Sequence, residues 1–268
     1  MEATGNTGAK SSVHWHRIGC VTRDDDVREY GIARRNSGDV LGMSEIKLVI
    51  AIPTAGMVRM GFAYSLAGLI SKLAAEGIKT RRESTLLVKM DVQESSVIHS
   101  NRELLVSRAL KDGQTHLLFL DDDMTFEPQI IDILAGRRQP VVAVNYCIKT
   151  EPPEFVAVGL DGERMPTIAS SGGLYPIAYT GFGVSLFELS VFEKTPQPWF
   201  LPKFNPEANC YTTEDNPCYE KIREAGFPVY LDQDASKLVS HIGAKGWHWS
   251  QWKPPEKPTN VVELKGAA

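Results

Sequence analysis

Apolar residues alternate between strand-like runs and helix-like spacing from residue 46 onward. The run IKLVIAIPT, residues 46–54, is apolar and stopped by proline, which is typical of a buried strand. The stretch FAYSLAGLISKLAAEG, residues 62–77, has helical spacing and ends at a glycine. Further strands are predicted at 84–92, 116–120 and 140–146, and further helices at 100–113 and 127–136. This alternation predicts an α/β fold of Rossmann-like type, with a mostly parallel sheet and helices on both faces.

The chain divides into three regions by composition. Residues 1–44 are polar and rich in Gly, Ser and charge, which predicts an extension that is ordered only in part. Residues 45–243 carry the alternation, and residues 244–268 form an aromatic and then proline-rich tail. Within the middle region, Pro, Gly and short apolar runs at 151–180 predict hairpins or a loop-rich insertion. A helix at 212–227, capped by Thr212 or Thr213, and strands at 228–232 and 237–243 are predicted to follow.

Bulk composition excludes several classes of protein. Hydrophobic residues make up 43% of the chain and charged residues 23%, as in soluble globular proteins, and the net charge of −4 provides no global basic field for nucleic acid. The four cysteines lack the spacing of a zinc knuckle or a disulfide framework. Neither a secretory signal nor an apolar run of membrane-spanning length is visible. We therefore expect a soluble, cytoplasmic protein without a membrane span.

Three adjacent aspartates, Asp121, Asp122 and Asp123, follow the strand predicted at 116–120. Like charges at the end of a buried strand repel one another and resist desolvation, so a cation is expected beside them. Mg²⁺ and Mn²⁺ prefer oxygen ligands and commonly bridge to phosphates. Because ligands bind beyond the carboxyl ends of strands in open α/β sheets, other strand-end residues should join this site. They are Pro53, Thr54, Asp91 and His241.

Two metal-dependent families share this local string. The pattern D-x-D-x-T, formed by Asp121, Asp123 and Thr125, resembles the haloacid-dehalogenase superfamily of phosphatases, in which the first aspartate is a nucleophile. Those phosphatases also need a later GDxxxD pair, and the nearest candidate, Asp232 with Asp234, lacks the glycine. The D-x-D equally resembles that of metal-dependent glycosyltransferases with the GT-A fold. The remaining alternative is that the three aspartates form an acidic turn at the surface that binds no ligand.

The order of the other motifs favours the glycosyltransferase resemblance. IAIPT at 50–54 resembles the nucleotide-binding strand of that fold, and SNRELLVSRAL at 100–110 the helix before the D-x-D strand. The segment 180–200 resembles the acceptor side of inverting enzymes, TED at 213–215 their x-E-D helix, and SHIG at 240–243 their late metal-binding histidine. The chain thus resembles GT-A glycosyltransferases of the family 2 type, including compact bacterial and phage proteins. Residues 45–243 would be the catalytic domain, with a small β-rich acceptor region.

The resemblance implies a role for each matching residue. The divalent metal, Mn²⁺ or Mg²⁺, is expected to be held by Asp121, Asp123 and His241. A nucleotide diphosphate-sugar donor, with UDP as the expected nucleotide, is expected to contact Pro53, Thr54, Asp91, Asn101, Arg102, Asp121 and Asp122. Asp215 is the expected general base for the acceptor hydroxyl, with Glu214 beside it; the alternative is that both only cap a helix.

The acceptor side is less determined by these motifs. Gly181 and Gly183 either let the backbone approach the acceptor or form an ordinary turn. Five aromatic residues either stack on a sugar or base or close over the core, namely Trp199, Phe200, Trp247, Trp249 and Trp252. Glycan, lipid-linked glycan, protein and hydroxymethylated DNA remain open as acceptors, and basic residues of the extension could contact DNA: Arg17, Arg23, Arg28, Arg34 and Arg35. A nucleotide-sugar-binding module without catalysis is the non-enzymatic alternative.

Overall fold

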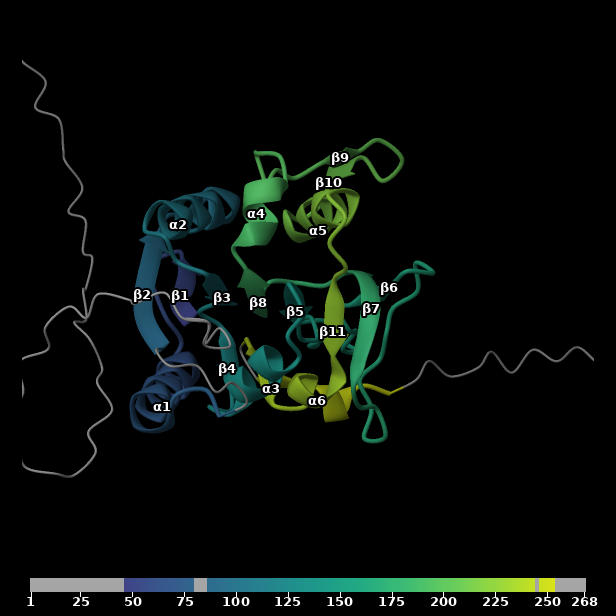
Figure 1. The fold of residues 1–268 in the computed structure, drawn as a ribbon. Helices are drawn as coiled ribbons and strands as arrows, with labels where there is room; N and C mark the ends of the chain where they lie inside the picture. Colours follow the sequence, from purple (N-terminus) through teal and green to yellow (C-terminus); the bar gives the residue numbers. More distant parts are fainter. Residues whose placement is uncertain (1–45, 80–85, 244–245, 254–268) are drawn as a thin grey trace, which may run out of the picture.

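The computed structural model describes residues 46–79, 86–243 and 246–253 (Figure 1). Its centre is an eight-stranded sheet with the order β2-β1-β3-β8-β5-β11-β7-β6. The strands are β1 (Ile46–Thr54), β2 (Leu86–Glu94), β3 (His116–Leu120), β5 (Val141–Ala143), β6 (Val158–Gly159), β7 (Leu174–Tyr179), β8 (Val184–Glu188) and β11 (Tyr230–Asp232). Strands β7 and β8 run antiparallel to each of their neighbours, so the other six share one direction. The predicted mostly parallel sheet is confirmed.

Alternating side chains of β1 enter two separate hydrophobic clusters. Ile46, Leu48, Ile50 and Ile52 face one cluster, and Val49 and Ala51 face the other, as the two-residue period of a strand requires. The first cluster includes residues of α1 (Met60–Glu76), α3 (Ile130–Gly136) and α6 (Gln233–Ser236). The second includes residues of α2 (Ile98–Lys111), α4 (Ser190–Lys194) and α5 (Asp215–Glu224). Helices therefore cover both faces, as predicted, and Figure 1 shows the two layers above and below the sheet.

A second, antiparallel sheet joins distant parts of the chain. It has the order β13-β12-β4, with β4 (Met124–Phe126), β12 (Val239–Ile242) and β13 (Gly246–His248). Strand β4 starts directly after the three aspartates, and His241 of β12 pairs in register with Met124. This small sheet therefore brings the D-x-D segment and the late histidine together.

Several predicted boundaries are wrong. Helix α2 starts at Ile98, with Val97 as its N-cap, instead of at residue 100. Strand β5 spans only Val141–Ala143 of the predicted 140–146. The hairpin of β9 (Phe204–Asn205) and β10 (Cys210–Tyr211) was not predicted. Strand β8, which pairs with both β3 and β5 in the central sheet, was not predicted either. The predicted hairpin at 151–180 exists as β6 paired with β7.

Residues 246–253 pack against the rest of the fold. Strand β13 pairs with β12, and the 3-10 helix Trp249–Gln251 follows it. Trp249 and Trp252 pack against the buried pair Cys147 and Phe155. In the described ranges, no helix is long and apolar enough to cross a bilayer. The predicted N-terminal extension, including its five arginines, lies outside the described residues.

Candidate functional site

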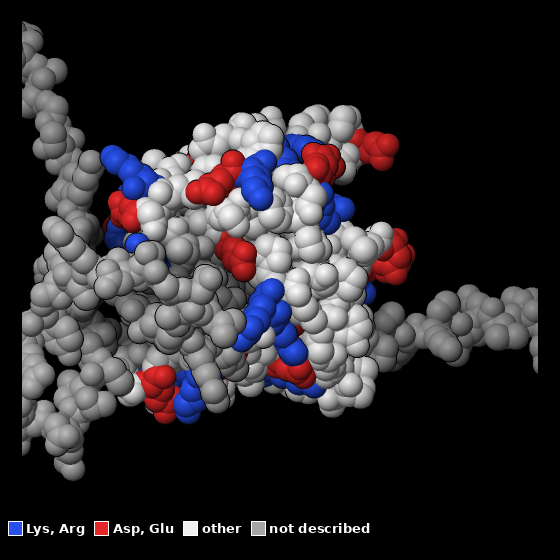
Figure 2. Space-filling model, viewed as in Figure 1, with Lys and Arg blue, Asp and Glu red and all other residues white. Residues whose placement is uncertain are grey.

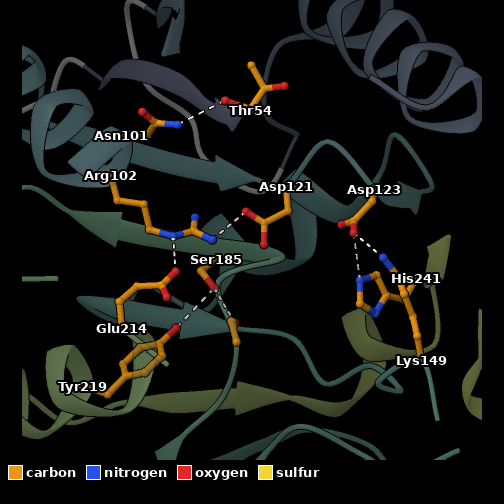
Figure 3. A network of polar contacts seen from close by, with 11 residues as sticks. Thr54, Asn101, Arg102, Asp121, Asp123, Lys149, Ser185, Glu214, Tyr219 and His241 are labelled. Carbon is orange, nitrogen blue, oxygen red and sulfur yellow. Dashed lines mark hydrogen bonds and ion pairs between the residues drawn. The ribbon is translucent and has the colours of Figure 1, made fainter. Parts of the chain in front are cut away.

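The backbone of the three aspartates is fixed by hydrogen bonds to different parts of the chain. The N–H of Asp121 donates to the carbonyl of Gly183 at 3.0 Å, the carbonyl of Asp122 accepts from Arg59 N at 3.2 Å, and that of Asp123 accepts from Ile242 N at 2.7 Å. The side chains of Asp121 and Asp123 bind different partners: Asp121 contacts Arg102, and Asp123 contacts His241 and Lys149 (Figure 3). The predicted joint metal set of Asp121, Asp123 and His241 is therefore not assembled. Among the described residues, no group of three His, Cys, Asp or Glu side chains is arranged to hold a metal.

Asp121 belongs to a buried ion network with Arg102 and Glu214. Arg102 Nη2 donates to Asp121 Oδ1 at 2.8 Å, and Arg102 Nε donates to Glu214 Oε1 at 3.1 Å. The Arg102 side chain is only 4% exposed, and the two carboxylates raise its pKa although burial alone would lower it. Burial and the nearby Asp123 raise the pKa of Asp121 more than Arg102 lowers it. The network ties the end of β3 to the start of α5.

The guanidinium of Arg102 packs against two neighbouring aromatic rings, Phe119 and Phe182, whose centroids are 5.7 Å apart. Its central carbon is 5.3 Å from the Phe119 ring centroid and 5.0 Å from that of Phe182. The third nitrogen, Nη1, is buried without a hydrogen-bond partner among the described residues. A buried, unpaired donor of this kind is costly, so it favours an acceptor from outside the chain.

Asp123 contacts a separate pair of groups, His241 and Lys149. His241 Nδ1 lies 3.0 Å from the carbonyl oxygen of Cys147, so this nitrogen donates, since a carbonyl only accepts. His241 Nε2 then lies 3.2 Å from Asp123 Oδ2, and Lys149 Nζ pairs with the same oxygen. Burial would raise the pKa of Asp123, but hydrogen bonds from His241 and Lys149 outweigh it and lower the pKa to about 2. The carboxylate is thus held ionised beside two nitrogen groups.

A pocket of about 210 Å³ opens beside the aspartates. Its lining comes from the end of β1, the start of α2 and the D-x-D turn, namely Pro53, Ala55, Ile98, Arg102, Asp121, Asp122 and Asp123. The sequence prediction placed Pro53, Arg102 and the aspartates in one donor site, and the structure does bring them together. The pocket combines a buried cation with three carboxylates.

Two predicted donor contacts are used inside the protein instead. Asn101 is fully buried, and its amide donates to the carbonyls of Thr54 at 3.1 Å and Ser95 at 2.9 Å, while its oxygen accepts from Ser95 Oγ. Thr54 is 5% exposed, and its hydroxyl accepts from Gly56 N at 3.0 Å. Both residues therefore fix the turn after β1, and neither is among the residues that line the pocket.

Asp91 is also not at the expected place. Strand β2 continues to Glu94, so Asp91 lies inside the strand instead of at its end. Its two oxygens accept from Arg108 Nε at 2.8 Å and Nη2 at 2.9 Å. This bidentate pair joins β2 to α2, and Asp91 has no part in the pocket.

Asp215 opens helix α5 next to the Arg102 network. Glu214 is the N-cap residue, but no side chain caps the helix, so the predicted capping by Thr212 or Thr213 is wrong. Asp215 Oδ1 accepts from Asn216 N at 2.8 Å and from the Thr213 hydroxyl. Burial raises the pKa of Asp215 more than these hydrogen bonds lower it. A carboxylate with a raised pKa is a stronger base, which suits general-base chemistry.

Sequence reasoning missed Tyr146, which lies among these groups. Burial raises its pKa well above the ordinary tyrosine value, with further contributions from Asp121 and Asp215, and its ring lies 5.2 Å from that of His241. A Cβ at Gly181 would lie 1.9 Å from the Tyr146 hydroxyl, and one at Gly183 would lie 2.8 Å from its ring. Both glycines therefore make room for Tyr146, and the spacing Gly-x-Gly was the available signal.

The aromatic residues close over hydrophobic clusters. Trp199 and Phe200 are 4% and 1% exposed, and Trp199 Nε1 donates to the carbonyl of Thr195 at 2.8 Å. The Trp252 ring packs 5.5 Å from Phe155, and Trp249 Nε1 donates to the Lys237 carbonyl at 3.3 Å. The side chain of Trp247 lies outside the described part of the chain. The core interpretation holds for these four residues.

Charge on the visible face is mixed. In Figure 2, Lys and Arg side chains of the described residues are interspersed with Asp and Glu, and no continuous basic band crosses this face. Duplex DNA contacts need clustered Lys and Arg.

Comparison with known proteins gives similarity in structure but none in sequence. No protein-family model matches the chain, and no curated protein matches it. A197 from STIV is similar with a TM-score of 0.48 and 18% identity, over 74% of this chain and 86% of that one. GalNAc-T7, solved with UDP, GalNAc and Mn²⁺, is similar with a TM-score of 0.47 and 11% identity, over 78% of this chain and 45% of that one. A nucleoside-diphosphate-sugar pyrophosphorylase from Vibrio cholerae RC9 is similar with a TM-score of 0.42 and 12% identity, over 72% of this chain and 94% of that one.

Proposed function

We propose that this protein is a glycosyltransferase that uses a divalent metal and a nucleotide diphosphate-sugar donor, with UDP as the nucleotide and inversion at the sugar carbon. The observation that carries the proposal is the arrangement at Asp123. His241 is oriented by the Cys147 carbonyl so that Nε2 faces Asp123 Oδ2 at 3.2 Å, beside the pocket. A histidine whose second nitrogen donates to a carbonyl is the usual form of a metal-binding imidazole.

The residues present fit Mn²⁺ or Mg²⁺ with two protein ligands. Because Nδ1 donates to the Cys147 carbonyl, the contact of Nε2 with the Asp123 carboxylate needs either a proton on Nε2, which makes a hydrogen bond, or a cation in place of that proton. Asp123 and His241 would hold the metal, and the remaining positions would go to diphosphate oxygens and water, as such ions allow. When bound, the metal offsets negative charge that develops on the leaving diphosphate. Asp121 is assigned no ligand role because Arg102 holds it.

Arg102 is proposed to donate to the same diphosphate. Its Nη1 is buried and unpaired among the described residues, and the guanidinium lines the pocket. The carboxylates of Asp121 and Glu214 keep the guanidinium in place, so no reorientation is needed when an anion arrives. Asp122 and Pro53 line the pocket beside it and would contact the nucleotide.

Asp215 is proposed as the base that takes the proton of the acceptor hydroxyl. Asp215 follows Glu214 directly in the chain, and Glu214 accepts a hydrogen bond from Arg102. The proposed base is therefore adjacent to a residue that contacts the proposed diphosphate-binding arginine. Its raised pKa makes it a better proton acceptor than an ordinary aspartate. Either a glycan or a hydroxymethylated DNA base would supply the hydroxyl that this chemistry needs.

The phosphatase alternative is weaker because its two acidic groups do not meet. Asp232 is fully buried, accepts from Asp234 N and Ala235 N, and pairs with Arg137, which also binds Asp234. Its strand β11 is separated from β3 by β8 and β5. Three strand spacings amount to roughly 14 Å, which is too far for a shared phosphoryl site.

Loss of Mn²⁺ binding in two variants tests the proposed metal site. We expect Asp123→Asn and His241→Ala to weaken Mn²⁺ binding by at least about 10-fold, because each removes one of two protein ligands. Electron paramagnetic resonance of free Mn²⁺ in titrations measures this without any turnover. The matched control is Asp112→Asn, which removes a carboxylate that pairs with Lys89 away from the pocket. Mn²⁺ affinity that is equal in all four proteins would contradict the site.

A further inference from the structure

Lys149 pairs with Asp123, and neither the motifs nor the proposed chemistry assigns it a role. Its Nζ contacts the same oxygen, Asp123 Oδ2, that His241 Nε2 approaches at 3.2 Å (Figure 3). Asp123 is its only ionic partner among the described residues. One carboxylate oxygen is thus shared by an ammonium and an imidazole.

The segment that carries Lys149 is fixed at its base. Cys147 forms an antiparallel bridge with Phe155, and Ile148 N donates to the Glu154 carbonyl at 2.8 Å. The bridge is covered by Trp249 and Trp252 of the C-terminal segment. The carbonyl of Cys147 also accepts from His241 Nδ1. The same backbone therefore positions both the imidazole and the lysine that meet at Asp123.

Two positive groups cannot share Asp123 Oδ2 without repulsion. A divalent cation held by Asp123 and His241 would lie within a few ångströms of the Lys149 ammonium, and like charges at that separation repel strongly. The Lys149 side chain is 32% exposed and has a flexible stem, so its head can leave at little cost. Asp123 lines the pocket, so a diphosphate bound in the pocket would be the anion closest to the displaced Lys149 ammonium.

We propose that Lys149 is the built-in counter-cation of Asp123, and that it moves to the donor's diphosphate when a divalent metal takes its place. The inference rests on the proposed function, because it deepens the role of the same site. Lys149 neutralises the acidic turn before the metal binds and stabilises the leaving diphosphate afterwards. Lys149 therefore competes with the metal for Asp123 before the reaction. During the reaction, Lys149 and the metal both stabilise the leaving diphosphate.

Because Lys149 competes with the metal but assists the leaving diphosphate, its loss should strengthen Mn²⁺ binding and lower kcat. In Lys149→Gln, we expect Mn²⁺ to bind about two- to five-fold tighter, because a partly exposed ion pair no longer competes. We expect kcat for release of nucleoside diphosphate from the donor to fall by roughly 10²-fold, because one cation is lost from the leaving group. Lys149→Arg keeps the charge and should retain Mn²⁺ affinity within about two-fold of the unmodified protein.

The matched control is Lys89→Gln, since Lys89 is 28% exposed and pairs with Asp112 in the same manner but away from the pocket. Mn²⁺ titration by electron paramagnetic resonance and steady-state kinetics are measured on all four proteins. Tighter Mn²⁺ binding together with a lower kcat in Lys149→Gln alone supports the proposal. Unchanged or weaker Mn²⁺ binding, or an unchanged kcat, overturns it. If Asp123→Asn weakens Mn²⁺ binding as expected in that case, the proposed function stands and only the role of Lys149 falls.

Discussion

Asp215→Asn is expected to lower kcat by about 10²- to 10⁴-fold, which is the range for loss of a general base. The acceptor hydroxyl must lose its proton as it attacks, and burial raises the pKa of Asp215, which strengthens it as a base. Asparagine keeps the oxygen that accepts from Asn216 N at 2.8 Å, so the start of α5 should be preserved. Release of nucleoside diphosphate from the donor, followed over pH, measures the loss.

The same substitution should stabilise the fold at neutral pH. A raised pKa means that the folded protein disfavours the ionised carboxylate, so ionised Asp215 reduces stability above its folded pKa, and this penalty disappears as the pH falls through that pKa. We therefore expect a Tm equal to or above that of the unmodified protein at pH 7. For the unmodified protein, kcat/KM should fall on the acid side through a pKa above the ordinary aspartate value, because the protonated form cannot act as a base.

Glu220→Gln is the control for Asp215→Asn, because Glu220 lies on the same helix and pairs with Lys203 at the surface. It should leave both kcat and Tm close to those of the unmodified protein. Asp215→Asn with full kcat would show that another group takes the proton. A marked drop in Tm would show instead that the carboxylate is structural.

Arg102→Met should destabilise the fold by about 3–5 kcal/mol, the loss expected when one partner of a buried ion network is removed. Asp121 and Glu214 would then be left near each other without a counter-cation, with side chains that are 23% and 13% exposed. Methionine keeps part of the packing against Phe119 and Phe182, so the expected loss comes mainly from uncompensated charge. Urea unfolding at pH 7 measures the free energy of unfolding.

Two further variants separate charge from packing at Arg102. Arg108→Met breaks a bidentate pair with Asp91 in which the arginine is 36% exposed, and its loss should be clearly smaller. Adding Asp121→Asn and Glu214→Gln to Arg102→Met removes both stranded charges and should recover part of the lost stability. Equal losses for Arg102→Met and Arg108→Met, or no recovery in the triple variant, would contradict the network's role.

The parts of the fold that depend on local periodicity were predictable. Strand β1 and helix α1 follow from the spacing of apolar residues, and the mostly parallel sheet follows from their alternation. The position of β8 between β3 and β5 depends on pairing between distant segments, which periodicity does not encode. Asp91 was expected near the strand end because the apolar pattern ended the strand at residue 92, whereas β2 continues to Glu94.

The site was predictable in its residue types and less so in its pairings. Asp123 and His241 meet as the motif order implied, although 118 residues separate them in the chain. The ion pair of Arg102 with Glu214 spans 112 residues, and neither residue type nor spacing indicates it. Asn101 was expected at the donor because its segment resembles the helix before the D-x-D strand of GT-A enzymes, but the fold buries it completely against the turn after β1. Burial depends on tertiary packing, which a single sequence does not reveal.

The most direct test of the central claim is release of nucleoside diphosphate from a panel of nucleotide-sugars, each with and without Mn²⁺. We predict Mn²⁺-dependent release from a UDP-sugar by the unmodified protein, and none by Asp123→Asn, since Asp123 and His241 are the proposed metal ligands. The opposite result is equally clear. The glycosyltransferase account would be contradicted if the protein hydrolysed phosphomonoesters, formed a beryllofluoride adduct at Asp121 and consumed no nucleotide-sugar.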